Sequence, residues 1–255
     1  MATRTIASGG GAWTSTSTWV EGSVPTSSDD VVGNSSSGDL NIDTTSAECK
    51  TIDLSAYTST IGAIGSKREL HVYGNMTLGS SNTWNTGGAV KIKLYSTGTI
   101  TFNGASIDAY LLTETSSATY TFVDAISTSY CISILNGTVH FDGANDNSGL
   151  SHSIDYLYVS GTPTIYYGAS TITMATSTHT VDFGFTATSA TTYAGTSHMK
   201  IEAAPRVQLA EQTLYDFSIL GTSGTLTFLS IIARLIREWR PISHLSIIIE
   251  SVMYE

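Results

Sequence analysis

Four aspartates in the central part of the chain could perform acid–base chemistry. Enzymes that hydrolyse glycosidic bonds place a pair of carboxylates around the scissile bond. The spacings between successive candidates are uneven, and nothing in these spacings requires the side chains to meet. A polysaccharide depolymerase therefore stays an alternative, which a cluster of carboxylates in a groove would support. The candidates are Asp108, Asp124, Asp155 and Asp182.

Other catalytic or metal sites have less support. The histidines form no His-x-His or His-Glu-x-x-His arrangement, and no Gly-x-Ser-x-Gly sequence marks a nucleophilic serine. An oxygen-rich loop containing Asp142, Asn145 and Asp146 could hold Ca²⁺. Its spacing matches no common calcium-binding pattern, which favours a solvated turn. We therefore predict no metal, no cofactor and no enzymatic activity.

The two cysteines, Cys49 and Cys131, lie far apart in the sequence, so they cannot form a Cys-x-x-Cys metal pair. We expect both to be buried small side chains. A single long-range disulfide is the alternative.

Tyrosines concentrate between positions 154 and 167. Tyr156 and Tyr158 must share one face of a strand, because side chains alternate between its two faces. If that face is exposed, these residues form a patch for a ligand or receptor, and we predict Tyr156, Tyr158, Tyr166 and Tyr167 as its binding residues. An inward aromatic ladder, or lateral packing between protomers, is the competing interpretation.

The composition predicts that these residues are carried by strands. Ser and Thr account for 75 of the 255 residues, and they alternate with β-branched and aromatic residues over most of the chain. This pattern fits a pleated surface with one buried face. We therefore expect an all-β protein.

Charge and hydropathy exclude several partners. With 11 Lys and Arg against 21 Asp and Glu, the net charge is −10, which disfavours nucleic acid and anionic membranes. The chain contains no apolar run long enough for a membrane span, and its first residues show no export signal. We expect neither membrane insertion nor secretion by a cleaved signal.

A Gly-Thr pair followed by an alternating segment recurs along the chain. Its copies begin at Gly98, Gly137, Gly161 and Gly224, and their separations approximate two, one and three units of about 20–24 residues. This repeat predicts a single-stranded, right-handed parallel β-helix over residues 1–228, in which coils stack around a dry interior. A β-sandwich or jelly roll is the alternative.

The last residues differ from the rest of the chain. Residues 229–255 are rich in Ile and lack Gly and Thr, and an apolar face over about 229–240 predicts a short amphipathic helix before Pro241. This helix would cap the solenoid or mediate oligomerisation. A shifted reading frame is a further explanation of the change in composition.

The first 35 residues contain a recognisable motif. Its matching residues are Gly11, Trp13, Thr18, Trp19, Gly22, Val24, Pro25, Asp30, Val31 and Val32. The segment resembles the opening motif of a group of repetitive β-helical surface and phage structural proteins. The resemblance implies an N-terminal cap that includes Trp13, Trp19, Pro25 and Asp30. We expect Asp29 or Asp30 to accept backbone hydrogen bonds in the turn that leads to Val31. Two indoles can fill the open end of a first coil, whereas a stacking platform for a sugar is the alternative role.

These observations together predict a non-enzymatic structural protein of a phage or similar virus, located on the tail, fibre or capsid exterior of the virion. Its expected partners are other virion proteins, further copies of itself and a host-surface glycan. A fragment of a bacterial cell-surface adhesin is the main alternative, with the depolymerase as a third.

Overall fold

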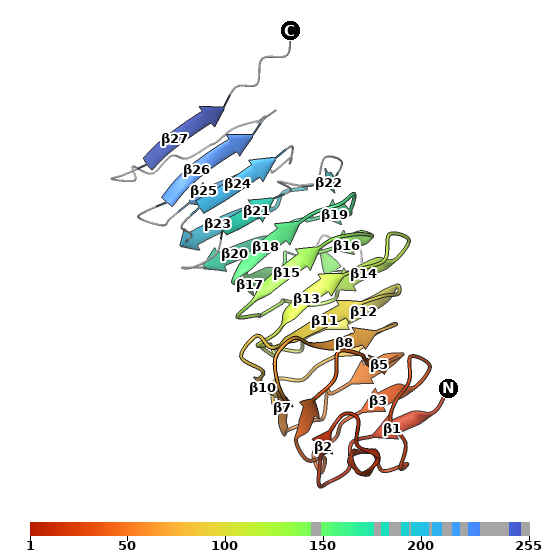
Figure 1. Cartoon of the computed structure of the whole chain (residues 1–255). Coiled ribbons are helices and arrows are strands. Elements are labelled where there is room, and N and C mark those ends of the chain that lie inside the picture. Colours follow the sequence, from red (N-terminus) through yellow and green to blue (C-terminus); the bar gives the residue numbers. More distant parts are fainter. Residues whose placement is uncertain are drawn as a thin grey trace.

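The chain forms an elongated β-solenoid of short parallel strands (Figure 1). The structure is a computed structural model that describes residues 1–143, 149–175, 180–183, 190–193, 195–203, 206–210, 216–219, 224–229 and 245–250. Within these residues, every pairing between named strands is parallel and joins strands of adjacent coils. The predicted parallel β-helix is therefore confirmed, and the β-sandwich alternative is wrong.

Three faces run along the solenoid, named here by their strands. Face A contains β1 (Thr3–Thr5), β3 (Asp30–Val32), β6 (Thr51–Asp53), β9 (Met76–Thr77), β12 (Gly98–Thr101), β14 (Thr119–Phe122), β16 (Thr138–His140), β19 (Thr164–Tyr166) and β22 (Thr191–Tyr193). Face B contains β5 (Ala47–Cys49), β8 (Arg68–Val72), β11 (Val90–Leu94), β13 (Tyr110–Thr113), β15 (Cys131–Ile134), β18 (Tyr156–Val159), β21 (Thr180–Phe183), β24 (Arg206–Ala210), β26 (Gly224–Leu229) and β27 (Leu245–Glu250).

Face C consists of two shorter sheets. The first contains β2 (Gly11–Ala12), β4 (Leu40–Ile42), β7 (Thr60–Ala63) and β10 (Thr83–Asn85). The second contains β17 (Ser151–Ile154), β20 (Thr171–Ala175), β23 (His198–Ala203) and β25 (Asp216–Ile219). A 3-10 helix, η1 (Thr16–Thr18), follows β2.

Coil length varies along the chain. A short coil separates His198 from its partner Asp216, whereas a much longer one separates Gly11 from its partner Leu40. The predicted unit of about 20–24 residues lies between these extremes. Three of the Gly-Thr copies begin or closely precede strands of face A, but the copy at Gly224 begins β26 of face B. The alignment of that copy is wrong, because the same alternation of polar and apolar residues serves every face of a coil.

Side chains alternate between a dry interior and the outer surface. In β11, Val90, Ile92 and Leu94 are buried, whereas Lys91 is exposed and Lys93 is partly exposed. Each coil buries too little apolar surface to be stable alone, so stacking on its neighbours closes the interior.

Aromatic rings stack inside the middle coils. The rings of Phe122 and Phe141 have centroids 5.2 Å apart, and those of Phe141 and Tyr167 are 5.7 Å apart, with interplanar angles of 22° and 20°. All three side chains are fully buried. The inward ladder considered for Tyr156 and Tyr158 is not formed by those residues, which lie on the outer face of β18; the interior stack consists of Phe122, Phe141 and Tyr167.

A further strand of face B lies near the C-terminus. Gly224 lies opposite Leu245, so β27 extends face B in parallel beyond β26. We predicted only a short helix within residues 229–255, whereas Leu245–Glu250 form a strand, as their consecutive isoleucines favour. Of the helix predicted over about 229–240, Leu229 ends β26 and the other positions lie outside the described residues.

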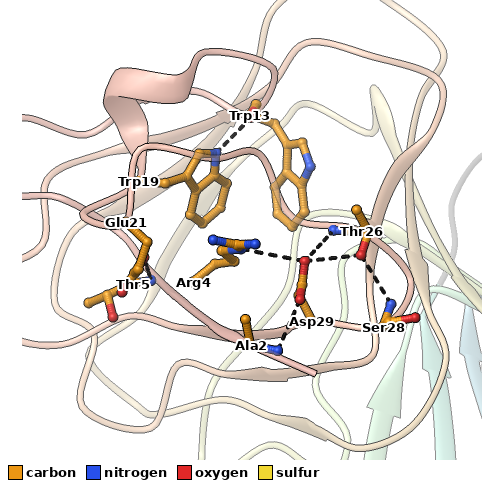
Figure 2. A network of polar contacts seen from close by, with 9 residues as sticks. All are labelled: Ala2, Arg4, Thr5, Trp13, Trp19, Glu21, Thr26, Ser28 and Asp29. Carbon is orange, nitrogen blue, oxygen red and sulfur yellow. Dashed lines mark hydrogen bonds and ion pairs between the residues drawn. The ribbon is translucent and has the colours of Figure 1, made fainter.

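The two N-terminal tryptophans lie in the interior of the first coil. Trp13 and Trp19 are 1% and 2% exposed, and their ring centroids are 5.0 Å apart in an edge-to-face arrangement. The Trp19 indole N–H donates a hydrogen bond of 2.9 Å to the Trp13 carbonyl oxygen (Figure 2). This geometry makes a sugar-stacking role for the pair untenable, because neither ring is accessible.

A buried carboxylate holds the same coil together. Asp29 accepts hydrogen bonds from the backbone N–H groups of Ala2 and Thr26, both 3.1 Å, and from the Thr26 hydroxyl at 3.0 Å. Figure 2 shows the Arg4 side chain between the indoles and Asp29, and its Nε lies 3.4 Å from the carboxylate. The Asp29 carboxylate thus links the N-terminal segment to the turn that precedes β3.

The carboxylate assigned to the cap by the motif behaves differently. Asp30 faces outward and accepts a 2.7 Å hydrogen bond from the hydroxyl of Thr51 on the next coil, while Pro25 is buried. Adjacent residues at a strand take opposite faces, so only one of two neighbouring aspartates can be buried. The buried one is Asp29, which corrects the choice of Asp30.

Asp29→Asn is expected to lower the free energy of unfolding at pH 7 by about 1–3 kcal/mol. Burial raises the pKa of Asp29, but the hydrogen bonds from Thr26 and Ala2 and the charge of Arg4 outweigh burial and hold this pKa below its ordinary value of 3.8. The carboxylate therefore stabilises the fold fully above that value, and the stabilisation is lost as pH falls through the lowered pKa.

Urea unfolding near pH 7 and near pH 3 measures this effect. We expect the difference between wild type and Asp29→Asn to shrink at the lower pH. Asp30→Asn removes an outward carboxylate of equal charge and serves as the matched control. A difference between wild type and Asp29→Asn that is the same at both pH values would contradict the role of the charge.

Candidate ligand-binding groove

An open groove with a volume of about 780 Å³ lies on the outer surface of face B. Its floor consists of outward side chains of β8, β11, β13, β15 and β18, and its wall consists of the loops that precede β8 and β11. Ser66, Lys67, Glu69, Gly87, Gly88, Ala89, Lys91, Tyr110, Leu112, Cys131, Ser133, Tyr156 and Tyr158 line it.

Strand register arranges the floor in rows that run along the solenoid. Lys91 lies opposite Glu69 on one side and opposite Tyr110 on the other, and Cys131 lies opposite Tyr156. Neighbouring strands of a sheet are about 4.7–4.9 Å apart, so the five strands of the floor span about 19 Å. The groove is therefore long enough for an extended ligand that crosses several coils.

Two glycines shape the wall of the groove. Gly87 and Gly88 have φ angles of 56° and 71°, which favour glycine, and a Cβ on Gly88 would overlap the ring of Tyr130. The ring of Tyr130 in turn lies 5.0 Å from that of Tyr110. Asp108 anchors this wall, because its carboxylate accepts a 2.7 Å hydrogen bond from the Gly87 N–H.

Tyr110, Tyr156 and Cys131 of the floor stay protonated at neutral pH. Burial is the main cause that raises the pKa of Tyr110 and of Tyr156 above the ordinary value of 10. Burial also raises the pKa of the Cys131 thiol to about 11, and its sulfur lies 3.3 Å from the Ser133 hydroxyl. The tyrosines can therefore donate hydrogen bonds, whereas the thiol is not poised as a nucleophile.

The structure separates the four tyrosines predicted to bind a ligand. Tyr156 and Tyr158 share the outer face of β18 and line the groove. Tyr166 lies on face A, where its ring stacks on Tyr193 with centroids 4.5 Å apart. Tyr167 is fully buried, so its prediction as a binding residue is wrong. The reason is alternation, because adjacent residues of a strand cannot both face outward.

The aspartates considered for catalysis do not form a cluster among the described residues. Asp108 holds the groove wall, and the Asp124 carboxylate accepts hydrogen bonds from the backbone N–H groups of Phe102 and Asn103. Asp155 immediately precedes β18. Asp182 belongs to β21 and lies opposite Tyr158 of β18. Two of the four carboxylates thus serve turns of the backbone.

The weak calcium candidate is only partly visible. Asp142 is buried and its carboxylate lies 3.2 Å from the ring of His140, while Asn145 and Asp146 lie outside the described residues. Cys49 and Cys131 are free and buried, so the expectation of buried thiols is confirmed over a disulfide.

Several residues of the groove were missed from the sequence. Tyr110, Lys67 and Lys91 belong to separate coils and have no short-range motif in common. The alternation of polar and apolar residues along each strand does mark Tyr110 and Lys91 as outward positions. Placing them in one groove with Tyr156 also requires the register between coils, and variable coil length hides that register in the sequence.

The fold and groove define a parallel β-solenoid with a tyrosine-lined lateral groove. No protein-family model, curated protein or solved structure matches the chain. Within the described part of the chain, no helix has the length and apolarity that a membrane span requires.

Proposed function

We propose that the chain is a non-enzymatic structural protein of the exterior of a phage or similar virion, and that it contacts host-surface glycans through the groove. The observation that carries the binding part of this proposal is the row of outward tyrosines on face B. Tyr110, Tyr156 and Tyr158 line one concave surface together with the backbone of two glycines.

The chemistry of this surface suits carbohydrate. A tyrosine presents a large apolar ring together with a hydroxyl that donates and accepts hydrogen bonds, so it can contact both the C–H face and the hydroxyls of a sugar. Ser133 adds a further hydroxyl to the floor. Ligand sites typically combine such apolar area with a few polar groups that fix orientation.

The scaffold supports a structural role. Its stacked coils bury a continuous core that includes rows of Ile, Leu and Val from consecutive strands. A rigid solenoid holds its lateral face in place without a ligand, which lowers the entropy lost on binding. The N-terminal motif and the Ser/Thr-rich strands support assignment to a virion, with other virion proteins and further copies of the chain as partners.

A depolymerase has less support from the geometry. Glu69 is the carboxylate among the lining residues, and it is already bound to the Lys93 and His71 side chains. Incubating the purified chain with surface polysaccharides tests this alternative. New reducing ends or unsaturated products would replace the non-enzymatic proposal with an enzymatic one.

The combined variant Tyr156→Ala/Tyr158→Ala is expected to bind glycans at least about tenfold more weakly than wild type, which corresponds to about 1.4 kcal/mol of lost contact. The physical reason is the loss of two outward rings from the groove floor. A glycan array followed by titration calorimetry with the strongest glycan measures the effect.

Tyr166→Ala is the matched control, because it removes an outward tyrosine from face A rather than from the groove. Its glycan affinity should equal that of wild type, and circular dichroism should show that both variants stay folded. Wild-type chain that binds no glycan, or a groove variant that binds as well as wild type, would refute the proposed contact.

A further inference from the structure

The groove has a cationic end. Lys67 and Lys91 line it and are both exposed. Within the described residues, no carboxylate lies within ion-pair distance of either ammonium group. Their charges are therefore available to a ligand, although the chain as a whole carries a net charge of −10.

The acidic residue in the same row does not cancel these charges. Glu69 lies 3.1 Å from the Lys93 ammonium group and 3.0 Å from the His71 ring. Burial raises the pKa of Glu69, but the hydrogen bonds from His71 and Lys93 outweigh burial and lower this pKa. Glu69 is thus ionised and shares Lys93 with Glu114, whose carboxylate lies 3.6 Å from the same ammonium group. Lys67, Lys91 and Lys93 together still outnumber these two carboxylates, which leaves an excess of positive charge at this end of the groove.

The backbone at Lys67 is unusual for a lysine. Its φ angle of 56° lies in the left-handed region. Among the described non-glycine residues, Asn103 also has a positive φ angle. The preceding loop is closed by a 2.6 Å hydrogen bond from the Arg68 Nε to the Ile64 carbonyl oxygen. Glycine would adopt this conformation more easily. Strained backbone of this kind tends to occur at functional sites.

The cationic and aromatic parts follow one another along the groove. Lys91 lies directly opposite Tyr110, and Tyr156 is three strands from Lys91, or about 14 Å at the usual strand spacing. A ligand that spans both parts must be extended and must carry negative charge at the end near β8 and β11.

We propose that the groove binds an acidic glycan, with a carboxylate or sulfate group at Lys67 and Lys91 and sugar rings over Tyr110, Tyr156 and Tyr158. This inference rests on the proposed glycan contact and adds the class of glycan. Because the chain carries a net charge of −10, attraction of an anion requires local positive charge, and we assign specificity for an acidic ligand to these two lysines.

The experiment compares acidic glycans with their neutral counterparts on one array. The acidic members carry uronic acid, sialic acid or sulfate groups, and the counterparts are carboxyl-reduced or desulfated. Wild type is expected to prefer the acidic members, and Lys91→Gln should weaken that binding at least about threefold. Raising NaCl from about 20 to about 200 mM should also weaken it, because salt screens exposed charges.

Lys67→Gly separates charge from folding. The substitution removes the ammonium group and also relieves the left-handed backbone, so the melting temperature should equal or exceed that of wild type while acidic-glycan affinity falls. Lys50→Gln is the matched control for Lys91→Gln, because it changes net charge equally at a partly exposed position outside the groove lining. It should leave affinity unchanged.

The possible failures are distinguishable. Equal binding to acidic and neutral members, or unchanged affinity in both lysine variants, would overturn the acidic-glycan inference and leave the glycan contact standing. Binding to no member of the array would overturn the glycan contact itself and this inference with it.

Discussion

Trp19→Ala lowers the free energy of unfolding by about 3–5 kcal/mol, the usual loss when a buried tryptophan is truncated. Trp19 is 2% exposed, packs edge-to-face on Trp13 and donates its indole N–H to the Trp13 carbonyl oxygen. Its removal leaves a cavity in the first coil and an unpaired buried carbonyl group. Because stability in a solenoid depends on neighbouring coils, we expect the loss to extend beyond the first coil.

Urea unfolding monitored by circular dichroism measures the change. Trp19→Phe should cost less, because it keeps an aromatic ring and loses only the hydrogen bond and part of the contact area. Val20→Ala is the neighbouring control, since Val20 is 66% exposed and its truncation should change stability by no more than about 0.5 kcal/mol. A loss below about 1 kcal/mol for Trp19→Ala would show that the paired indoles do not cap the coil.

Phe141→Ala is expected to lower the free energy of unfolding by a similar amount, about 3–5 kcal/mol, through a loss of packing in the middle coils. Its fully buried ring lies between the rings of Phe122 and Tyr167 on adjacent coils and makes an edge-to-face contact with His152. Truncation therefore breaks contacts with three rings at once. Phe141→Leu keeps most of the buried volume and should cost clearly less.

Hydrogen exchange locates the effect of Phe141→Ala. Amides of β14, β16 and β19 should lose protection most, because a solenoid transmits stability through nearest-neighbour coils. Amides of β3 and β6 should change less. A uniform loss of protection along the chain would mean that the solenoid unfolds as a single cooperative unit, and the local account of the aromatic stack would then be wrong.

The role of Asp29 shows how a motif can indicate a region without indicating the residue. The opening motif pointed to the first coil and to Asp30, but the carboxylate that joins Ala2, Thr26 and Arg4 is Asp29. The two residues are chemically identical and adjacent, so composition and spacing cannot separate them. Only the path of the chain before β3 determines which carboxylate turns inward.

The local alternation of residue types in the sequence was sufficient to predict the class of fold. Alternation of small polar residues with β-branched and aromatic ones predicted strands, and it correctly paired Tyr156 with Tyr158 on one face. The recurrent Gly-Thr segments predicted stacked coils. These properties depend on residues close together in the chain, because the period of two along a strand is a local steric property.

Only the tertiary structure determines which residues line the groove. Lys67, Lys91, Tyr110 and Tyr156 come from different coils and become neighbours only because each outward position lies one strand spacing from its counterpart. Since coil length differs from one coil to the next, the sequence contains no constant interval from which to read that register. The chain by itself thus determined that it is a stack of strands, and the packing of one coil on the next determined which side chains share a surface.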